Sequence, residues 1–281
     1  MYLYKFHDYN KLKNKLDTIF KSRCFKMNCL TYNVGQANCN YVKLDDFGFF
    51  FDIGLTNKND PNKNHIDNAC KEIERLKASV VVLSHWDLDH ILGITLNNPN
   101  FDRCVFIAPR FNDIKSRWVS AIRMCAVLKI RGADFCLISK EFENSIVYET
   151  PSKEVTIWKG KAIVMNNINA KNNFGLILKL QGNDSMLLPG DCDYDVMNMN
   201  PNIFATTYSH IVIPHHGSVM GNVLSVLKKN SKSGIAYVCQ GEKTGNFKAD
   251  SNLVQNYTSL NYKVKNTKDL MESKKYRVKL R

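Results

Sequence analysis

One stretch constrains the fold of this chain more than any other: Ser84-His85-Trp86-Asp87-Leu88-Asp89-His90. It follows directly after the apolar run 79–83, which is short and rich in β-branched residues, as buried strands are. Imidazoles and carboxylates therefore lie at the carboxyl end of a strand, where open α/β sheets place their sites. Imidazole suits zinc, manganese or iron, and carboxylate favours harder ions such as manganese and magnesium. These ligands would crowd one ion but suit a pair; the alternative is a polar turn with solvated charges.

Two further apolar runs also end in potential metal ligands. Residues 185–188 lead into Pro189-Gly190-Asp191, and residues 210–214 lead into His215-His216-Gly217-Ser218. Rigid strands fix the loops that leave them, so loops that end side by side can bring distant residues to one place. The three strand ends therefore predict a single constellation of carboxylates and imidazoles.

The order of the remaining apolar patterns predicts an α+β fold. Strands are expected at 26–32, 38–44, 49–54, 103–108, 133–138, 155–158, 162–166, 174–180 and 235–239. Helices are expected at 9–22, 66–76, 91–96, 114–130, 223–228 and 253–260. Strands and helices follow one another similarly in two halves of the chain. This pattern predicts two sheets packed face to face with helices outside, a four-layer αββα sandwich.

Composition narrows the partners and the setting. Lys plus Arg number 39 against 26 acids, a net charge of +13 that favours polyanions such as nucleic acid or nucleotides. The alternative is that most lysines are only solvated and reflect an AT-rich genome. The 9 cysteines are scattered without a Cys-x-x-Cys pair, which indicates reduced thiols and a cytoplasmic location. No run approaches the ~18 apolar residues of a membrane span, so no membrane partner is expected.

The ordered motifs of the chain resemble those of the metallo-β-lactamase fold superfamily. They look most like the hydrolase domain of ComEC-type competence proteins. The matching segments are 34–36, 51–54, 84–93, 172–176, 187–191 and 214–218. The match covers about residues 27 to 270. We therefore expect a metallo-β-lactamase-like hydrolase domain over residues 25–281 and an N-terminal helical extension over residues 1–24.

The resemblance implies a centre with two divalent metal ions, Zn²⁺ or Mn²⁺. One ion would be held by Asp89, His90 and one of the pair His215-His216, the other by His85 and Asp87, with Asp191 bridging. Asp52 would support the site from behind the ligands. His215 is the expected ligand of the pair because it comes first off the strand, which leaves His216 behind the ligands or as a proton donor.

The chain departs from the superfamily pattern at three places. Asp87 stands where most members have His, although the ComEC-like branch shares the Asp. Asn172-Asn173 stand in the region of a further His, and no His lies between His90 and Asp191. Lys248 stands where the ComEC-like pattern tends to place His. The resemblance thus implies a full set of ligands for the first metal ion and a weakly held second ion. A catalytically inactive relative is therefore an alternative.

The predicted activity is hydrolysis by a metal-activated water, without a Ser or Cys nucleophile. The charge of +13 favours a phosphodiester, so the first hypothesis is a nuclease or other phosphodiesterase. The residues assigned to catalysis are Asp87, Asp89, His216 and Lys248, and those assigned to substrate binding are Asn173 and Lys243. The alternatives are a small-molecule hydrolase acting on a nucleotide, lactone or thioester, and a catalytically weakened nucleic-acid-binding relative.

Overall fold

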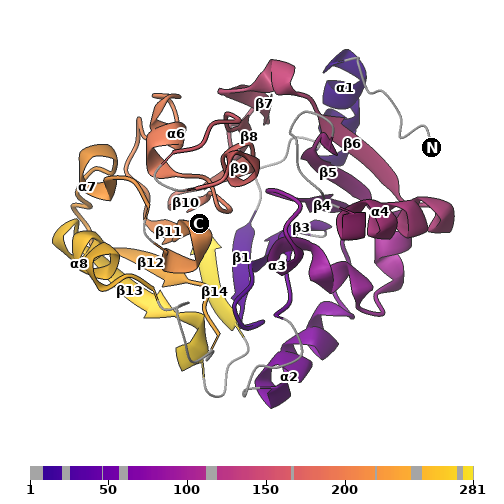
Figure 1. Cartoon of the computed structure of the whole chain (residues 1–281), viewed down its shortest axis with the longest axis horizontal. Helices are drawn as coiled ribbons and strands as arrows, with labels where there is room; N and C mark the ends of the chain where they lie inside the picture. Colours follow the sequence, from indigo (N-terminus) through magenta and orange to yellow (C-terminus); the bar gives the residue numbers. More distant parts are fainter. Residues whose placement is uncertain are drawn as a thin grey trace.

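The predicted sandwich of two sheets with helices outside is confirmed. The computed structural model describes residues 9–20, 26–45, 47–56, 63–111, 119–165, 168–218, 220–241, 249–270 and 275–280. Two seven-stranded sheets lie face to face, and helices cover their outer faces (Figure 1). Among these residues, no helix has both the length and the apolar character that a membrane crossing requires.

The first sheet contains most of the N-terminal half of the chain. Its order is β14 (Lys275–Leu280), β1 (Met27–Tyr32), β2 (Cys39–Leu44), β3 (Phe47–Ile53), β4 (Val80–Val82), β5 (Val105–Pro109) and β6 (Asp134–Ile138). Strands β3 to β6 are parallel, and β14, β1, β2 and β3 are antiparallel. Parallel neighbours need long crossovers, which here carry α2 (Lys63–Ile73), α3 (Leu88–Ile91) and α4 (Val119–Arg131).

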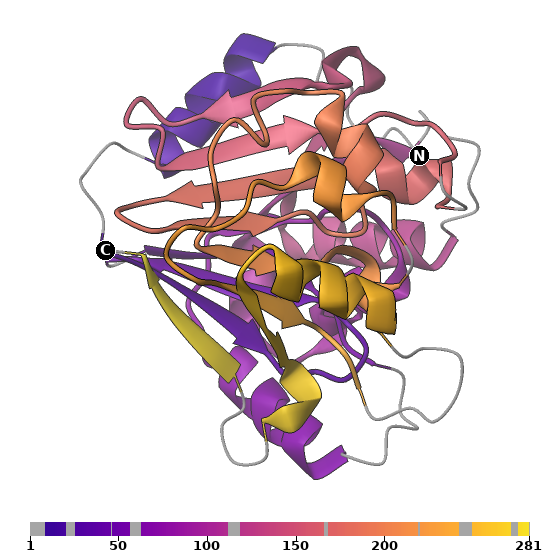
Figure 2. The same cartoon turned by 90° about the vertical axis from the view of Figure 1, so that its left-hand side faces the viewer.

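The second sheet repeats this plan with the rest of the chain. Its order is β13 (Tyr262–Asn266), β12 (Gly234–Val238), β11 (His210–Val212), β10 (Ser185–Leu188), β9 (Leu176–Gln181), β8 (Val155–Lys159) and β7 (Ser145–Glu149). Strands β10 to β13 are parallel. Their crossovers carry α6 (Tyr194–Asn198), α7 (Val223–Val226) and α8 (Ser251–Ser259), which Figure 2 shows in front of the sheet. A further short helix, α5 (Ala170–Asn173), precedes β9.

One-turn 3₁₀ helices complete the described secondary structure. They span Leu92–Thr95, Pro99–Arg103, Lys140–Phe142 and Thr267–Asp269, whereas Pro214–Gly217 is a turn whose two central residues do not have helical backbone angles.

The structure contains elements that were not expected, β7, β13, β14, α5 and α6, and it also differs from the elements that were expected. The strand expected at 162–166 is absent from its described residues, where Met165 forms only an isolated bridge to Ile168. The helix expected from residue 91 already begins at Leu88, so Asp89 and His90 lie on it rather than in a loop. No strand was expected at 275–280, where β14 returns to the first sheet and pairs with β1 (Figure 1).

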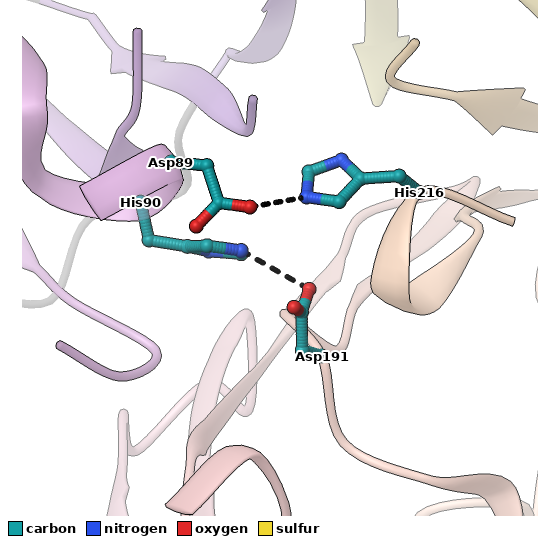
Figure 3. A group of neighbouring side chains, drawn as sticks. All are labelled: Asp89, His90, Asp191 and His216. Carbon is teal, nitrogen blue, oxygen red and sulfur yellow. Dashed lines mark hydrogen bonds and ion pairs between the residues drawn. The ribbon is translucent and has the colours of Figure 1, made fainter. Parts of the chain in front are cut away.

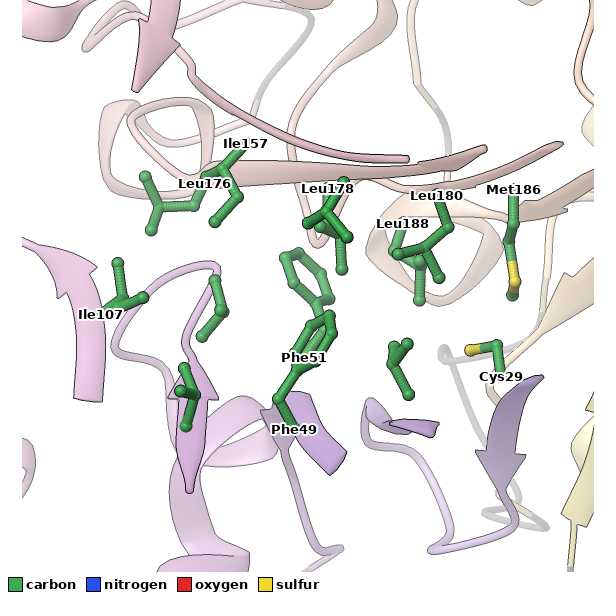
Figure 4. Close-up of a cluster of buried hydrophobic side chains, with 14 of the residues drawn as sticks. Cys29, Phe49, Phe51, Ile107, Ile157, Leu176, Leu178, Leu180, Met186 and Leu188 are labelled. Atoms are coloured by element: carbon green, nitrogen blue, oxygen red, sulfur yellow. The ribbon is translucent and has the colours of Figure 1, made fainter. Parts of the chain in front are cut away.

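The main core lies between the two sheets. Successive side chains of a strand point to opposite faces, and β3 shows the consequence. Phe49 and Phe51 point into the inter-sheet core, toward Leu178 and Leu188 of the second sheet (Figure 4). Phe50, between them, packs instead in the cluster beneath the helices of the first sheet. A strand buried on both faces reads as a continuous apolar run, as Phe49-Phe50-Phe51 does.

Helix α1 (Tyr9–Ile19) closes one end of the inter-sheet core, next to β6 and β7 (Figure 1). Leu16 is 0% and Phe20 1% exposed, and both belong to the cluster between the sheets. The Phe20 ring lies 5.3 Å from the Phe49 ring and 5.5 Å from the Tyr148 ring. The expected boundary of an extension at residue 24 stays a prediction, but this helix shares the core of the rest.

Phe20→Ala tests whether the N-terminal helix belongs to the same cooperative unit. The lost ring leaves a cavity beside Phe49, so unfolding should become easier by about 3–5 kcal/mol. Denaturant unfolding followed by circular dichroism measures this free energy. Ile130→Ala is the control, because this side chain is 86% exposed and its loss should leave the free energy nearly unchanged. Equal effects of the two substitutions would show that residues before 24 fold apart from the sandwich.

Candidate metal centre

Four potential ligands converge where the carboxyl ends of parallel strands from both sheets meet. Asp89 and His90 follow β4 of the first sheet, Asp191 follows β10 and His216 follows β11 of the second. One ligand atom from each lies within 4.8 Å of the others (Figure 3). His90 Nε2 lies 3.1 Å from Asp191 Oδ1, and His216 Nε2 lies 3.1 Å from Asp89 Oδ2. The predicted convergence of three distant segments is therefore present.

Two close backbone approaches set the positions of the acidic ligands. A Cβ on Gly54 would lie 1.8 Å from the Asp89 carbonyl oxygen, so only glycine lets α3 approach the end of β3 this closely. Gly190 has a φ of +59°, and a Cβ there would lie 2.4 Å from Ser84 Cβ. The turn that presents Asp191 therefore packs directly on Ser84. Both glycines belong to the motifs that the sequence showed.

A buried carboxylate lies behind the ligands, at the position expected for Asp52. Asp52 is 0% exposed and accepts hydrogen bonds from the Ser84 backbone N–H at 2.7 Å and the Ser84 hydroxyl at 2.8 Å. His90 Nδ1 lies 2.8 Å from Asp52 Oδ2 and donates to it. This bond fixes the proton on Nδ1 and directs the lone pair of His90 Nε2 toward the centre, as metal-binding histidines require.

The His216 ring is oriented in the same way by a backbone carbonyl. Its Nδ1 donates to the Cys239 carbonyl oxygen at 2.9 Å, so Nε2 faces Asp89. Burial favours the neutral ring, but Asp89 and Asp191 outweigh it and raise the pKa of His216. Burial also opposes ionisation of Asp191, but His90 and His85 outweigh it and hold the Asp191 pKa well below its usual range. The cluster thus favours positive charge at its centre.

The adjacent His215 does not belong to this cluster, although it was the expected ligand. Both histidines have left-handed backbone conformations, with φ of 50° at His215 and 54° at His216. His215 Nε2 stays 3.8 Å from Asp191 Oδ2, and 31% of its side chain is exposed. The second residue after the strand, rather than the first, therefore points into the centre. Strand alternation could not reveal this, because neither histidine has extended backbone.

His85 and Asp87, the expected second pair of ligands, lie beside the cluster. His85 is fully buried, and its Nε2 lies 3.7 Å from both Asp87 Oδ2 and Asp191 Oδ2. Both Asp87 oxygens accept hydrogen bonds from Lys171 Nζ, at 2.7 and 2.6 Å. Burial opposes ionisation of Asp87, but His85 and Lys171 outweigh it and lower its pKa. Sequence reasoning missed Lys171, whose position just before Asn172-Asn173 was the available signal.

Asn173, predicted to bind substrate, is engaged by groups behind the centre. Asn173 is 0% exposed; its amide donates to the Ile163 carbonyl at 3.0 Å and its oxygen accepts from the Asp193 N–H at 2.8 Å. These bonds give Asn173 a structural position. Asn172 instead points toward the centre, with Nδ2 3.5 Å from Asp191 Oδ2. Lys243 and Lys248 lie outside the described residues.

The donor set fits a divalent metal ion. His85 Nε2, His90 Nε2 and Asp191 Oδ1 are buried and have no hydrogen-bond partner. Buried polar atoms are normally paired, so orphaned atoms that face one another indicate a ligand. Imidazole nitrogen and carboxylate oxygen are the donors that Zn²⁺ and Mn²⁺ accept. The residues present therefore fit such an ion.

Comparison with solved structures defines the fold. YhfI from Bacillus subtilis, described as a metallo-β-lactamase fold protein, is 10% identical over 90% of this chain and 99% of its own, with a TM-score of 0.52. This chain has the metallo-β-lactamase fold. Zn²⁺-bound PqqB from Methylobacterium extorquens is 12% identical over 86% of this chain and 87% of its own, with a TM-score of 0.50. No protein-family model and no curated protein matches the sequence.

A third similar structure is longer than this chain. A variant of the CmlA β-hydroxylase is 13% identical, with a TM-score of 0.54, and the match covers 90% of this chain but 54% of that one. The similarity to YhfI confirms the fold that the resemblance in the sequence implied. The narrower likeness to ComEC-type proteins finds no support in these comparisons and stays a hypothesis.

Asp52→Asn tests the support behind the ligands. Asparagine keeps the shape and tolerates the φ of 59° at this position, but only its Oδ1 can accept a hydrogen bond. Its NH2 group takes the place of the other accepting oxygen and leaves a donor of Ser84 or His90 without a partner. Leaving such a buried donor unpaired should lower the free energy of unfolding by about 1–3 kcal/mol. Thermal unfolding of the metal-free protein measures the loss. Asp134→Asn, at a side chain that is 37% exposed, is the matched control, and an equal effect there would contradict the assignment.

Proposed function

We propose that this protein is a metal-dependent hydrolase that cleaves phosphodiester bonds in nucleic acid. The observation that supports the proposal most directly is the convergence of Asp89, His90, Asp191 and His216 at the meeting edge of the two sheets. The metallo-β-lactamase fold and a similar structure described as Zn²⁺-bound are consistent with a divalent ion at this position. The four residues would hold that ion through two imidazole nitrogens and two carboxylate oxygens.

A bound divalent ion supplies an acidified water molecule and stabilises charge on the attacked centre. Two potential nucleophiles of the described residues near the centre are disfavoured. Cys192 is 0% exposed, and burial raises the pKa of its thiol, so the reactive thiolate is disfavoured. The Ser84 hydroxyl is also buried and donates to Asp52. Water is therefore the nucleophile that this arrangement favours.

The side chains at the centre differ in their exposure to solvent, and this difference suggests separate roles for His215 and His216. The Asp89 side chain is 38% exposed, whereas His90, Asp191 and His216 are buried. His215 is also partly exposed, and burial lowers its pKa, so its neutral ring could take up the proton that the attacking water loses and then pass it to the leaving oxygen. We assign His216 to metal binding and His215 to proton transfer at the leaving oxygen, the reverse of the roles expected from the sequence.

Charge supports a polyanionic substrate. The whole chain carries a net charge of +13, although the centre itself contains two carboxylates. Exposed basic side chains follow the edge strands β13 and β14, among them Lys263, Arg277 and Lys279. Such a surface attracts a phosphate backbone and does not favour a neutral lactone or thioester.

Cleavage of labelled single- and double-stranded DNA and RNA in the presence of Mn²⁺ or Zn²⁺ tests the proposal. Wild-type protein should cleave at least one of them, and a chelator should abolish the reaction. Asp191→Ala should lower the rate by more than about 100-fold, beyond the effect typical of an outer hydrogen-bond partner. Asp134→Asn should leave the rate unchanged. The proposal fails if wild-type protein cleaves none of these substrates, or if Asp191→Ala cleaves as fast.

The two adjacent histidines can be separated by metal content and rate. His216→Ala should remove the bound ion, because its Nε2 is one of four donors within 4.8 Å. His215→Ala should keep the ion and lose turnover, because its ring lies outside that group. Elemental analysis of the purified variants, paired with the cleavage assay, measures both effects. Loss of the ion only in His215→Ala would contradict this assignment and would identify His215 as the ligand, as expected from the sequence.

A further inference from the structure

The ammonium group of Lys171 lies beside the four-residue cluster. Lys171 Nζ donates to both carboxylate oxygens of Asp87, at 2.7 and 2.6 Å. Neither side chain is a free surface group: Lys171 is 28% and Asp87 23% exposed. Charge-assisted bonds to both oxygens of a half-buried carboxylate are stronger than those of an exposed ion pair.

The Lys171 ammonium group is bound to the Asp87 carboxylate, which a second metal ion would need as a ligand. Asp87 Oδ2, the oxygen that lies 3.7 Å from His85 Nε2, is also the one 2.6 Å from Lys171 Nζ. A cation bound between His85 and Asp87 would therefore share this oxygen with the ammonium group. Two cations on one carboxylate repel each other strongly where burial limits screening. The lysine and a second ion thus compete for the same place.

Lys171 is held at this place by its neighbours. It lies on α5, where Asn173 is hydrogen-bonded to the Ile163 carbonyl and the Asp193 N–H. Just after α5, the Leu176 N–H donates to the Ser84 carbonyl at 2.8 Å. The segment that carries Lys171 and the segment that carries Asp87 are therefore joined at Ser84. Such anchoring lowers the conformational entropy that the lysine loses when it pairs.

We propose that the Lys171 ammonium group takes the place of a second metal ion, so that the centre binds one divalent ion per chain. This inference rests on the metal-dependent function proposed above and replaces the pair of ions expected from the sequence. The single ion is held by Asp89, His90, Asp191 and His216. Asp87 then serves to position Lys171. Asp87 takes two of the three ammonium donors, which leaves the third to contact an anionic oxygen of the substrate.

Metal stoichiometry tests the inference without relying on activity. Metal-free protein is titrated with Zn²⁺ or Mn²⁺ in a calorimeter, and elemental analysis of the dialysed protein gives the bound ions per chain. Wild-type protein should bind one ion. Lys171→Ala should bind two, because His85 and Asp87 become available beside Asp191. Lys171→Arg, which keeps the positive charge, should bind one.

Two controls separate a local effect from a general one. Lys171→Ala combined with Asp87→Asn should return the stoichiometry to one ion, because the carboxylate of the second position is lost. Lys129→Ala removes another lysine–aspartate pair, with Asp134, and should leave it at one. Circular dichroism establishes that each variant is folded, and Lys171→Gln replaces Lys171→Ala if the latter is not.

The outcomes distinguish this inference from the function on which it rests. Two ions in wild-type protein, or one ion in the folded variants Lys171→Ala and Lys171→Gln, would overturn the role of Lys171 while leaving a metal-dependent hydrolase in place. No ion in wild-type protein would overturn the proposed function itself. One ion in wild type and two in Lys171→Ala would support both.

Discussion

The hydrogen bonds at Ser84 are the junction on which the centre depends. On one side, the Ser84 backbone N–H and hydroxyl both donate to the buried Asp52 at the end of β3. On the other side, its carbonyl accepts from Leu176 at the start of β9, in the opposite sheet. The turn at Gly190 packs on its Cβ. One small residue thus joins the segments that carry His90, Asp191 and Lys171, and a larger side chain would separate them.

The sequence predicted what local patterns determine. The apolar runs gave most strands, and the ligand types at three strand ends gave the convergence of Asp89, His90 and Asp191, because parallel strands end at one edge. The strand expected at 162–166 failed because a few apolar residues without a partner strand do not make a ladder. The structure places His216 rather than His215 in the cluster, and this placement depends on positive φ values that the sequence does not display.

Two contacts between distant segments were not predicted from the sequence. Lys171 and Asp87 are 84 positions apart, and the motif beside Lys171 marks its segment but does not identify Asp87 as its partner. The pairing of β14 with β1 was not predicted either, because the terminal strand is rich in basic residues and pairs with a strand at the other end of the chain. In both cases the basic side chains have an ordinary solvated interpretation in the sequence, and only the folded structure shows which of them are paired.

The origin of the four ligands couples the centre to the whole sandwich. Asp89 and His90 belong to the first sheet, and Asp191 and His216 to the second. An ion held by all four binds only when both sheets are folded and packed, so its binding free energy adds to the stability of their packing as well as to that of each sheet. Helix α1 acts on the same packing from the other side, because Leu16 and Phe20 fill the end of the inter-sheet core. An ion at the centre and the hydrophobic core would therefore stabilise the same interface between the two sheets.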